Sequence, residues 1–449
     1  MTSNSFLPYI FYKYILRINS TRGRLFSLGL VITAILLTCM PASAYTLGVF
    51  GNANEDGTID QNDVKYTTSV VLGLDNQTRL ADAKYNGEIN VLDVTQTELI
   101  ILGMEKKLTL VDADDRIVTV NKPVDRIIIY HHQCGEMLQV LHLDNKVVGV
   151  RDTFERQPRR FPVMSTKPSI GNGGSPDIEA ILMLEPDIVL AYTFYPEYES
   201  LNDKLPDHIA VLRVGCTGIG EFGGMEDIEA VREEAIKFGY IFDAMDEAER
   251  YLEWHDRYVD EIIKRVSEIP DDEKLRVFVE SSGGTEISRT GIGKGHPAHG
   301  LCQLAGGINM GAGCIPSDSS GSGCEYGDIE VEWILNQNPE VILGRAMGSG
   351  IRPYELDDDA LLKAYHNEIK SLPGFENVAA VKNDRVYLIT NDHAITPNYP
   401  SALVTMAKWF YPVRFEDMDP QAIHQEYMDL MNISFNVYEH GTFVYPELS

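Results

Sequence analysis

Two twelve-residue stretches of the chain carry oxygen-bearing side chains at a spacing that can wrap a hard cation. Residues 52–63 and 82–93 both place Asn or Asp at positions 1, 5, 9 and 12, with glycine at position 6 for a sharp turn. Position 3 differs, because Asn54 adds an oxygen whereas Lys84 brings a positive charge. This difference predicts that the first loop is the better Ca²⁺ site. The expected ligands are Asn52, Asn54, Asp56, the carbonyl of Thr58, Asp60 and Asp63 in the first loop, and Asp82, Asn86, Asn90 and Asp93 in the second.

The two loops and the segments after them resemble a known module. Both loops end in Asp rather than the Glu of sensor-type EF-hands, and a single helical run ending in Leu-Gly follows each. Residues 45–107 thus resemble a type I dockerin, which implies a small all-α, calcium-binding module that docks to a cohesin on another extracellular protein. The resemblance assigns recognition to Gln61, Asn62, Val91 and Leu92, which are not the Ser/Thr pairs of the best-known examples. The alternative is a pair of Asp/Asn-rich turns that hold no metal.

Aromatic, cationic and polar side chains follow the predicted strands in the rest of the chain. Ligands of open α/β sheets bind beyond the carboxyl ends of the strands, so these side chains are expected to line a ligand cleft. Their mixture suits a bulky, partly aromatic, anionic chelate better than a sugar or an amino acid. The expected cleft residues are Tyr130, His131, His132, Arg151, Tyr192, Phe194, Tyr195, Ser281, Arg345, Asn391 and His393.

Four arginines stand close together in an otherwise acidic chain. Arg151, Arg156, Arg159 and Arg160 follow the second predicted strand, and their guanidinium groups could focus an anion into the cleft. The alternative is a solvated loop whose charges balance nearby acids.

Several histidines are candidates for direct zinc or manganese ligation, which is an alternative to single contacts with a bound solute. They are His131, His132, His296, His299 and His393. The chain contains no Gly-x-Ser-x-Gly elbow, no His-Glu-x-x-His and no phosphate loop with the required lysine spacing. We therefore expect a binding protein and not an enzyme.

The elements that must position these residues form two sets of β-branched runs separated by helical runs. The interval between the sets, residues 223–269, lacks proline, and its second half, residues 245–267, predicts a charged helix of roughly 35 Å. The expected fold is therefore α/β, with two Rossmann-like lobes joined by one long helix. The predicted strands cover residues 126–130, 146–150, 187–191 and 210–214 in the first lobe, and 276–279, 340–343 and 385–389 in the second.

The two predicted lobes repeat one another in sequence. Residues 177–190 (DIEAILMLEPDIVL) align with residues 330–343 (EVEWILNQNPEVIL), and a Glu stands seven residues before a Pro in both. These acids, Glu179 and Glu332, are expected in the exposed first turn of a helix, where the helix dipole favours them. Stabilisation of the helix is the alternative to a role in recognition.

The order of motifs resembles the helical-backbone, class III solute-binding proteins that deliver ferric siderophores, haem and vitamin B12 to ABC importers. The motifs are residues 122–127 (KPVDRI), 176–182 (PDIEAIL), 184–189 (LEPDIV), 304–309 (LAGGIN) and 372–387 (LPGFENVAAVKNDRVY). The resemblance implies capture of an iron complex or corrinoid and docking of Glu179 and Glu332 to arginines of the permease. The alternatives are a cell-surface assembly role through the dockerin-like module, or direct Zn/Mn binding.

The amino terminus predicts export. A basic stretch and an apolar run precede the small-residue pattern that ends at Ala44, as in a cleaved signal peptide. A retained anchor helix or a lipid on Cys39 are the alternatives. The protein is thus expected outside the cytoplasm, either extracellular or on the cell-surface or periplasmic side of the membrane, where one bridge among Cys302, Cys314 and Cys324 is reasonable.

The formal net charge of -29 excludes nucleic acid as a partner.

The predicted organisation is a signal peptide in residues 1–44, the dockerin-like module in 45–107, an N-terminal lobe in 108–222, an interlobe helical segment in 223–269 and a C-terminal lobe in 270–449.

Overall fold

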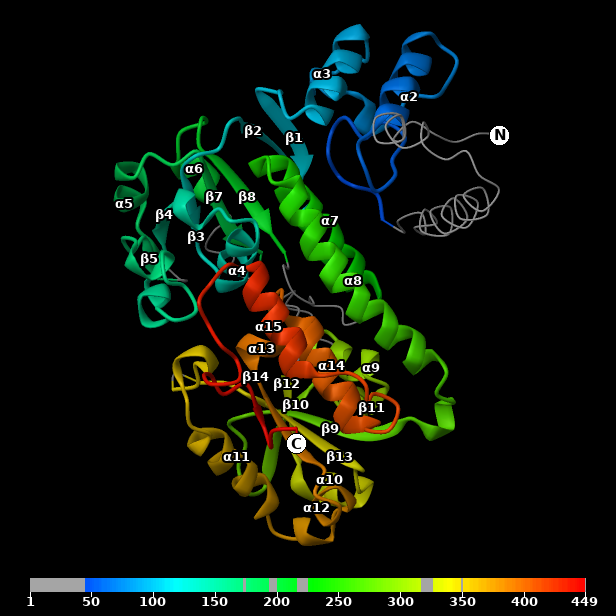
Figure 1. Cartoon of the computed structure of the whole chain (residues 1–449), viewed down its shortest axis with the longest axis vertical. Helices are drawn as coiled ribbons and strands as arrows, with labels where there is room; N and C mark the ends of the chain where they lie inside the picture. Colours follow the sequence, from blue (N-terminus) through cyan, green and yellow to red (C-terminus); the bar gives the residue numbers. More distant parts are fainter. Residues whose placement is uncertain are drawn as a thin grey trace, which may run out of the picture. The chain divides into compact units, whose positions relative to one another are not determined.

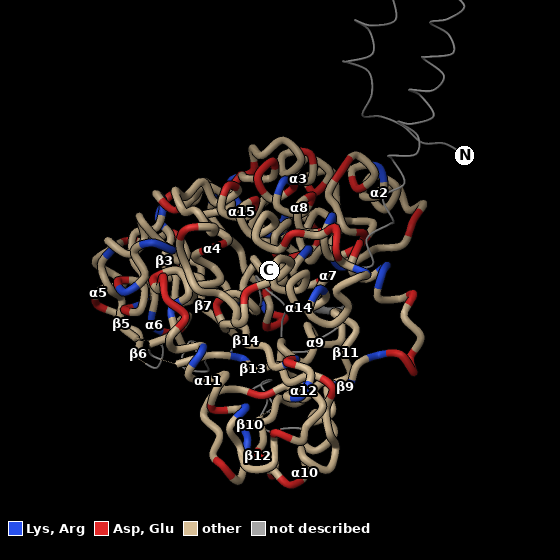
Figure 2. Tube along the Cα trace, turned by 60° about the horizontal axis from the view of Figure 1, so that its bottom comes forward, with Lys and Arg blue, Asp and Glu red and all other residues tan. Residues whose placement is uncertain are grey.

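The computed structural model describes residues 45–172, 175–193, 200–215, 225–315, 326–348 and 350–448 (Figure 1). The expected signal peptide, Phe194, Tyr195, Cys216 and Cys324 lie outside the described residues. The chain from Tyr45 onward forms one compact unit. Its acidic residues are spread over many elements (Figure 2).

The segment with the two predicted calcium loops folds as a helix pair. Helix α2 spans Gln61–Val71 and α3 spans Val91–Ile101. Each begins with the same capping box, made by Asp60 and Asp63 in α2 and by Asn90 and Asp93 in α3. The shared caps show that the sequence repeat is also a repeat of structure.

This helix pair is built into the rest of the molecule. Leu47, Val49, Ile59 and Ile100 belong to the same buried cluster as residues of both lobes. Val49 also bridges Leu110 in β1 (Lys107–Val111), which pairs antiparallel with β2 (Ile117–Asn121). The segment therefore shares a hydrophobic core with the body and has no core of its own.

The N-terminal lobe is a four-stranded parallel sheet in the order β4-β3-β7-β8. The strands are short, buried, β-branched runs, as expected when helices cover both faces. All four predicted strands are confirmed, with shifts of one residue at most ends. The elements are β3 Ile127–Ile129, α4 His132–Val140, β4 Val147–Val150, a two-residue pair β5 Gly171–Asn172 and β6 Ser175–Pro176, α5 Ile178–Met183, β7 Ile188–Tyr192, α6 Leu201–Lys204 and β8 Ala210–Val214.

The C-terminal lobe is a mixed sheet in the order β12-β10-β9-β13-β14-β15, with β11 also pairing β9. The three predicted strands are its parallel centre, and antiparallel strands flank them. The strands are β9 Leu275–Ser281, β10 Ser288–Ile292, β11 Gly307–Asn309, β12 Tyr326–Glu330, β13 Val341–Ala346, β14 Val386–Thr390 and β15 Val444–Tyr445. The helices are α9 Pro297–Leu304, α10 Val331–Gln337, α11 Ala360–Lys370, α12 Ala379–Lys382 and α13 Asn391–Ala394.

Two long helices connect the lobes. Helix α8 covers Met245–Ser267, as predicted, and a tight turn at Asp243 joins it to α7 (Met225–Phe242). The two helices pack as an antiparallel hairpin, because Arg232 of α7 forms ion pairs with Asp256 and Asp260 of α8. The connection between the lobes is thus a helical hairpin, and not the one long helix expected from the sequence.

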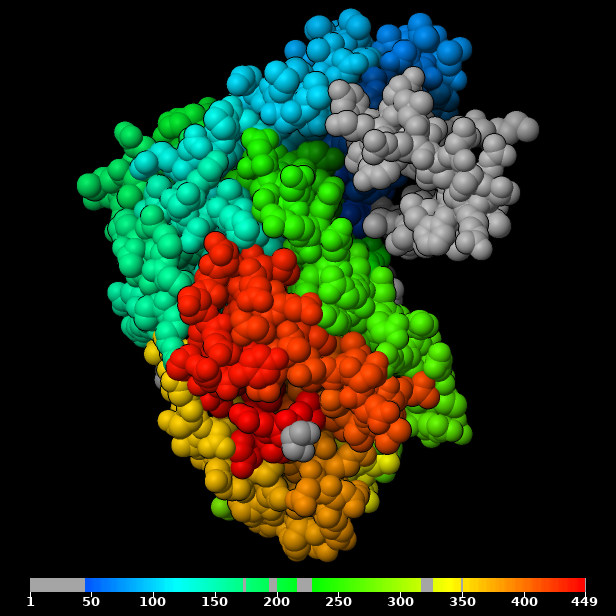
Figure 3. All heavy atoms as spheres, viewed as in Figure 1, coloured from blue at the N-terminus to red at the C-terminus, as the bar shows by residue number. Residues whose placement is uncertain are grey.

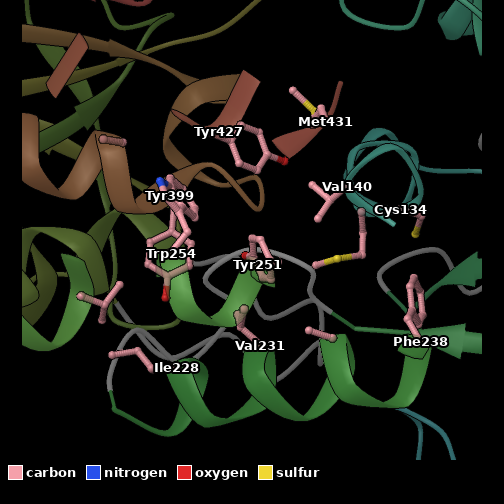
Figure 4. Packing of buried hydrophobic residues seen from close by; sticks show 14 of the residues in the cluster. Cys134, Val140, Ile228, Val231, Phe238, Tyr251, Trp254, Tyr399, Tyr427 and Met431 are labelled. Carbon is pink, nitrogen blue, oxygen red and sulfur yellow. The ribbon is translucent and has the colours of Figure 1, made fainter. Parts of the chain in front are cut away.

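Helices from both lobes pack on this hairpin. Figure 4 shows side chains of α4, α7 and α8 meeting those of α14 (Tyr399–Phe410) and α15 (Pro420–Leu430). The indole of Trp254 lies 5.2 Å from the ring of Tyr427 and 6.0 Å from that of Tyr251. The C-terminal segment fills the surface between the lobes in Figure 3. One continuous core therefore runs through both lobes.

Candidate functional site

On the N-terminal side, the site is built where β3 and β7 end next to each other. His131 caps α4, and its ring stacks on Tyr192 with centroids 4.3 Å apart and planes inclined by 16°. Burial and the charges of Arg151 and Arg160 lower the pKa of His131 to about 3. The imidazole is therefore neutral and adds an aromatic face to that of Tyr192.

The imidazole of His132 is held by contacts on several sides. Its ring packs on Phe154 and Phe161, and Nε2 is hydrogen-bonded to Thr153 Oγ1 and Gln157 Nε2, both at 3.0 Å. Burial keeps its pKa well below the ordinary value. These contacts tie His132 to the arginine-rich segment that follows β4.

The arginines of that segment do not act as one cluster. Arg160 is fully buried and donates to Glu136 Oε1, Gln157 Oε1 and Asp392 Oδ2 at 2.8, 2.9 and 2.8 Å. Arg159 forms an ion pair with Asp357, whereas Arg156 is exposed beside Glu155. The expectation that all four focus an anion is therefore wrong, because carboxylates already neutralise Arg159 and Arg160. Arg151 forms an ion pair with Asp152 at 3.8 Å, and its charge also helps to lower the pKa values of His131 and His132.

On the C-terminal side, Arg345 stands at the end of β13 and is almost fully buried. Its Nε donates to Asn391 Oδ1 at 2.6 Å, and its Nη1 donates to the hydroxyl of Tyr326. That hydroxyl is also hydrogen-bonded to His296 Nε2 at 2.7 Å. Tyr326 and His296 thus hold the guanidinium in one orientation.

Sequence reasoning missed Tyr326 as a site residue. It begins the edge strand β12, directly after a Gly/Ser-rich segment that carries no periodicity. Its aromatic side chain at the border of that segment was the one available signal.

The two sides meet in a continuous network. Gln157 joins His132 to Arg160, and Arg160 donates to Asp392 of the other lobe. Asn391 Nδ2 lies 3.5 Å from Asp392 Oδ1 and its oxygen accepts from Arg345. The structure therefore connects His132 of one lobe to Asn391 and Arg345 of the other, and His131 with its stacked Tyr192 lies next to His132.

Three predicted cleft residues lie in the protein interior instead. Tyr130 is fully buried and donates to Ile170 O at 3.2 Å. Ser281 is buried against Met347, and His393 packs on His424 with ring centroids 4.8 Å apart. The alternation of side chains along strands turns Tyr130 and Ser281 into the core, a direction that strand assignment from sequence did not resolve. His393 lies in the short helix α13, where it is buried.

Two cavities lie beside Tyr192 and Arg159, and neither is lined by the hydrogen-bonded residues of the network. One of about 590 Å³ lies between β8, α7 and the helix pair, and its lining includes Tyr192 and Arg213. Another of about 510 Å³ lies between residues 158–163 and 432–440, and its lining includes Arg159 and Phe435.

The expected calcium loops have donor chemistry suited to a hard cation. In the first loop Asp63 is fully buried, and burial together with Asp56 and Asp60 raises its pKa to about 6. Asp63 Oδ1 accepts from Asn54 N, and Asp93 Oδ1 accepts in the same way from Lys84 N. The side chains also bond one another, since Asn54 Nδ2 donates to Asp56 Oδ2 at 2.7 Å. No group of three His, Cys, Asp or Glu placed to hold a metal occurs in the described part of the chain.

The matched acids occupy equivalent places in the two lobes. Glu179 and Glu332 are exposed in the first turns of α5 and α10, and each helix precedes a buried central strand. Both views show the two helices apart, in different lobes (Figures 1 and 2).

The cysteines that the structure describes are free. Cys134 and Cys302 are buried and Cys314 is exposed. The bridge considered between Cys302 and Cys314 is therefore absent. No helix within the described ranges combines the length and apolar character needed to cross a membrane.

Known proteins are similar to this chain in sequence and in fold. The family model described as periplasmic binding protein matches residues 127–393. The molybdate-binding protein MolA of Haemophilus influenzae is 23% identical over 335 residues, covering 70% of this chain and 87% of its own. The structure of that protein with bound molybdate, classified as part of an ABC transporter, aligns with a TM-score of 0.57 and 20% identity over 73% of this chain and 98% of its own.

A second solved structure is similar to the same extent. The TroA-like periplasmic binding protein FepB of Veillonella parvula aligns with a TM-score of 0.59 and 20% identity, covering 75% of this chain and 98% of its own. Because the family match spans more than half of the sequence, the chain belongs to the periplasmic binding protein family.

Proposed function

We propose that this solute-binding protein captures an anionic, metal-containing solute between its lobes, namely an iron complex such as a ferric siderophore or haem, or a corrinoid. The observation that carries the proposal is the polar network that joins His132 of one lobe to Arg345 of the other. A guanidinium stays charged at every physiological pH and binds carboxylates and other oxyanions through paired donors. The stacked rings of His131 and Tyr192 add a flat apolar surface beside these charges.

The relative whose name gives its ligand supports a small anion. MolA is named for molybdate, a small oxyanion. An arginine held by Asn391 and Tyr326 suits such an oxyanion as well as the carboxylates of a chelate. Binding measurements must therefore distinguish a small oxyanion such as molybdate from a larger chelate.

We also propose that the protein works outside the cytoplasm after removal of residues 1–44 and delivers its solute to the permease through Glu179 and Glu332. Exposure of both acids supports this role, because each can reach a cationic partner without rearrangement. Direct binding of a bare zinc or manganese ion receives less support, because His296 and His299 are hydrogen-bonded to Tyr326 and Asn309.

The test of solute capture is a calorimetric titration with ferric enterobactin, haemin, cyanocobalamin and molybdate. We expect one of them to bind and Arg345→Gln to abolish that binding. The matched control is Arg276→Gln, because Arg276 lies near the opposite end of the same sheet and pairs with Glu340. If no compound binds, or if Arg345→Gln binds as tightly as the wild type, the proposed site is wrong.

A second proposal concerns the helix pair in residues 45–107. We propose that it is a dockerin-like, calcium-binding module that attaches the protein to a cohesin-bearing partner outside the cell. The observation in its favour is a set of exposed large apolar side chains on this short segment. They are Val71, Leu72, Leu74, Tyr85, Val91, Leu92, Leu102 and Met104.

A further inference from the structure

Three carboxylates of the C-terminal lobe hold one short segment of the N-terminal lobe. Glu355 Oε1 accepts from the backbone N–H groups of Arg159 and Arg160 at 2.9 and 3.3 Å. Asp357 pairs with the Arg159 guanidinium through both oxygens at 3.0 Å, and Asp392 pairs with Arg160. The C-terminal lobe thus contacts this segment at the backbone N–H groups and the side chains of Arg159 and Arg160.

The grip is strongest at Arg160, because its side chain is fully buried. The guanidinium forms ion pairs with Glu136 of its own lobe and with Asp392 of the other lobe. Its central carbon also lies 4.9 Å from the centroid of the Phe161 ring and 5.2 Å from that of the Tyr354 ring. Separating the lobes would leave a desolvated charge with one carboxylate less. Removing one partner of a buried ion pair is strongly unfavourable, so this contact resists opening.

The same residue connects both halves of the proposed site. Through Gln157 it fixes the position of His132, and through Asp392 it reaches Asn391, which holds Arg345. A shift of Arg160 would therefore displace groups in both lobes at once.

We propose that residues 157–160 are an interlobe latch and that Arg160 is a positioning residue that sets the distance between the two halves of the site. The positioning role rests on the proposed function, whereas the latch itself can be tested without any solute. The α7–α8 hairpin joins the lobes covalently on one side, and the latch holds them together through ion pairs on the other side.

The C-terminal lobe contains a matched control. Arg289 is also fully buried and is paired with a buried carboxylate, Glu280, and a more exposed one, Glu368. This triad repeats the chemistry of Arg160 with Glu136 and Asp392, but all three members belong to one lobe. Weakening it perturbs a buried arginine without loosening an interlobe contact.

The experiment is hydrogen–deuterium exchange of the solute-free protein, with Asp392→Asn compared with Glu368→Gln. For Asp392→Asn we expect residues 154–161 and 391–396, on opposite sides of the latch, to exchange about tenfold faster or more, as follows when a buried ion pair is weakened. Strands β13 and β14 should keep their protection. Asp392→Glu should restore slow exchange, which a purely volume-dependent packing role would not allow.

The proposal is overturned if Asp392→Asn leaves exchange unchanged, accelerates only one of the two segments, or acts no differently from Glu368→Gln. Should Asp392→Asn fail to fold, Asp357→Asn provides the same test, because its carboxylate is half exposed. In that variant the two segments must again exchange faster together. Failure of solute binding with an intact latch would contradict the proposed function alone.

Discussion

Arginine serves two purposes in this molecule, and its surroundings decide which. Arg159 and Arg160 are neutralised by carboxylates of the other lobe, whereas Arg345 is held by the neutral groups of Asn391 and Tyr326. A guanidinium with neutral partners keeps its full charge for a solute. Sequence could predict the residue type needed for an anion but not these partners, because those of Arg159 and Arg160 lie about 200 residues away and those of Arg345 come from separate elements.

Two buried histidines should make stability depend on pH. Burial lowers the pKa of His393 to about 3 and that of His424 well below the ordinary 6.5, so the unfolded chain binds protons more readily than the folded protein. Stability is therefore complete above pH 6.5 and falls as the pH drops below it, by about 1.4 kcal/mol per pH unit for each histidine.

The measurement is urea unfolding at about pH 7.5 and about pH 5.5. His424→Phe keeps a ring against Phe443 and should reduce the loss at the lower pH, whereas His208→Gln, at an exposed position, should not. An equal loss in His424→Phe and the wild type would refute this assignment.

At the scale of elements, periodic segments could be predicted and irregular ones could not. The proline-free, charge-rich residues 245–267 predicted α8 at Met245–Ser267, and the capping residues of α2 and α3 follow from the loop repeat. The antiparallel strands β10, β12 and β15 were missed, because short edge strands lack a long apolar run. The direction of Tyr130 and Ser281 was missed for the related reason that a one-residue shift reverses a side chain in a strand. His393 was missed because it lies in the short helix α13 and not at a strand end.

The helix pair yields a prediction about metal. Ca²⁺ should raise the melting temperature of the mature protein relative to an excess of chelator, since a ligand of the folded state stabilises it. Asp63→Asn should abolish this shift, and Asp93→Asn should retain most of it, because Lys84 occupies position 3 of the second loop.

Differential scanning fluorimetry of the two variants provides the comparison. Identical melting temperatures of the wild type with Ca²⁺ and with chelator would contradict calcium binding. Because Leu47, Val49 and Ile59 belong to the shared core, point variants are a cleaner test than deletion of residues 45–107.

At the scale of the whole molecule, duplication could be predicted from sequence and the contact between the copies could not. Residues 177–190 and 330–343 align because each lobe repeats the same helix and strand. The shared core and the Arg160–Asp392 ion pair instead depend on the angle between the lobes, which no local pattern encodes. The two lobes are thus held together by the α7–α8 hairpin on one side and by the latch on the other. Each lobe exposes one of the matched acids, Glu179 or Glu332.

The central claim is that this unit hands a captured solute to a membrane permease. The most direct measurement is uptake of the bound solute by cells that carry Glu179→Arg and Glu332→Arg, alongside titration of the purified variant. The account predicts uptake as low as in cells lacking the protein, with solute affinity unchanged. Normal uptake by the double variant, or loss of its solute affinity, would contradict it.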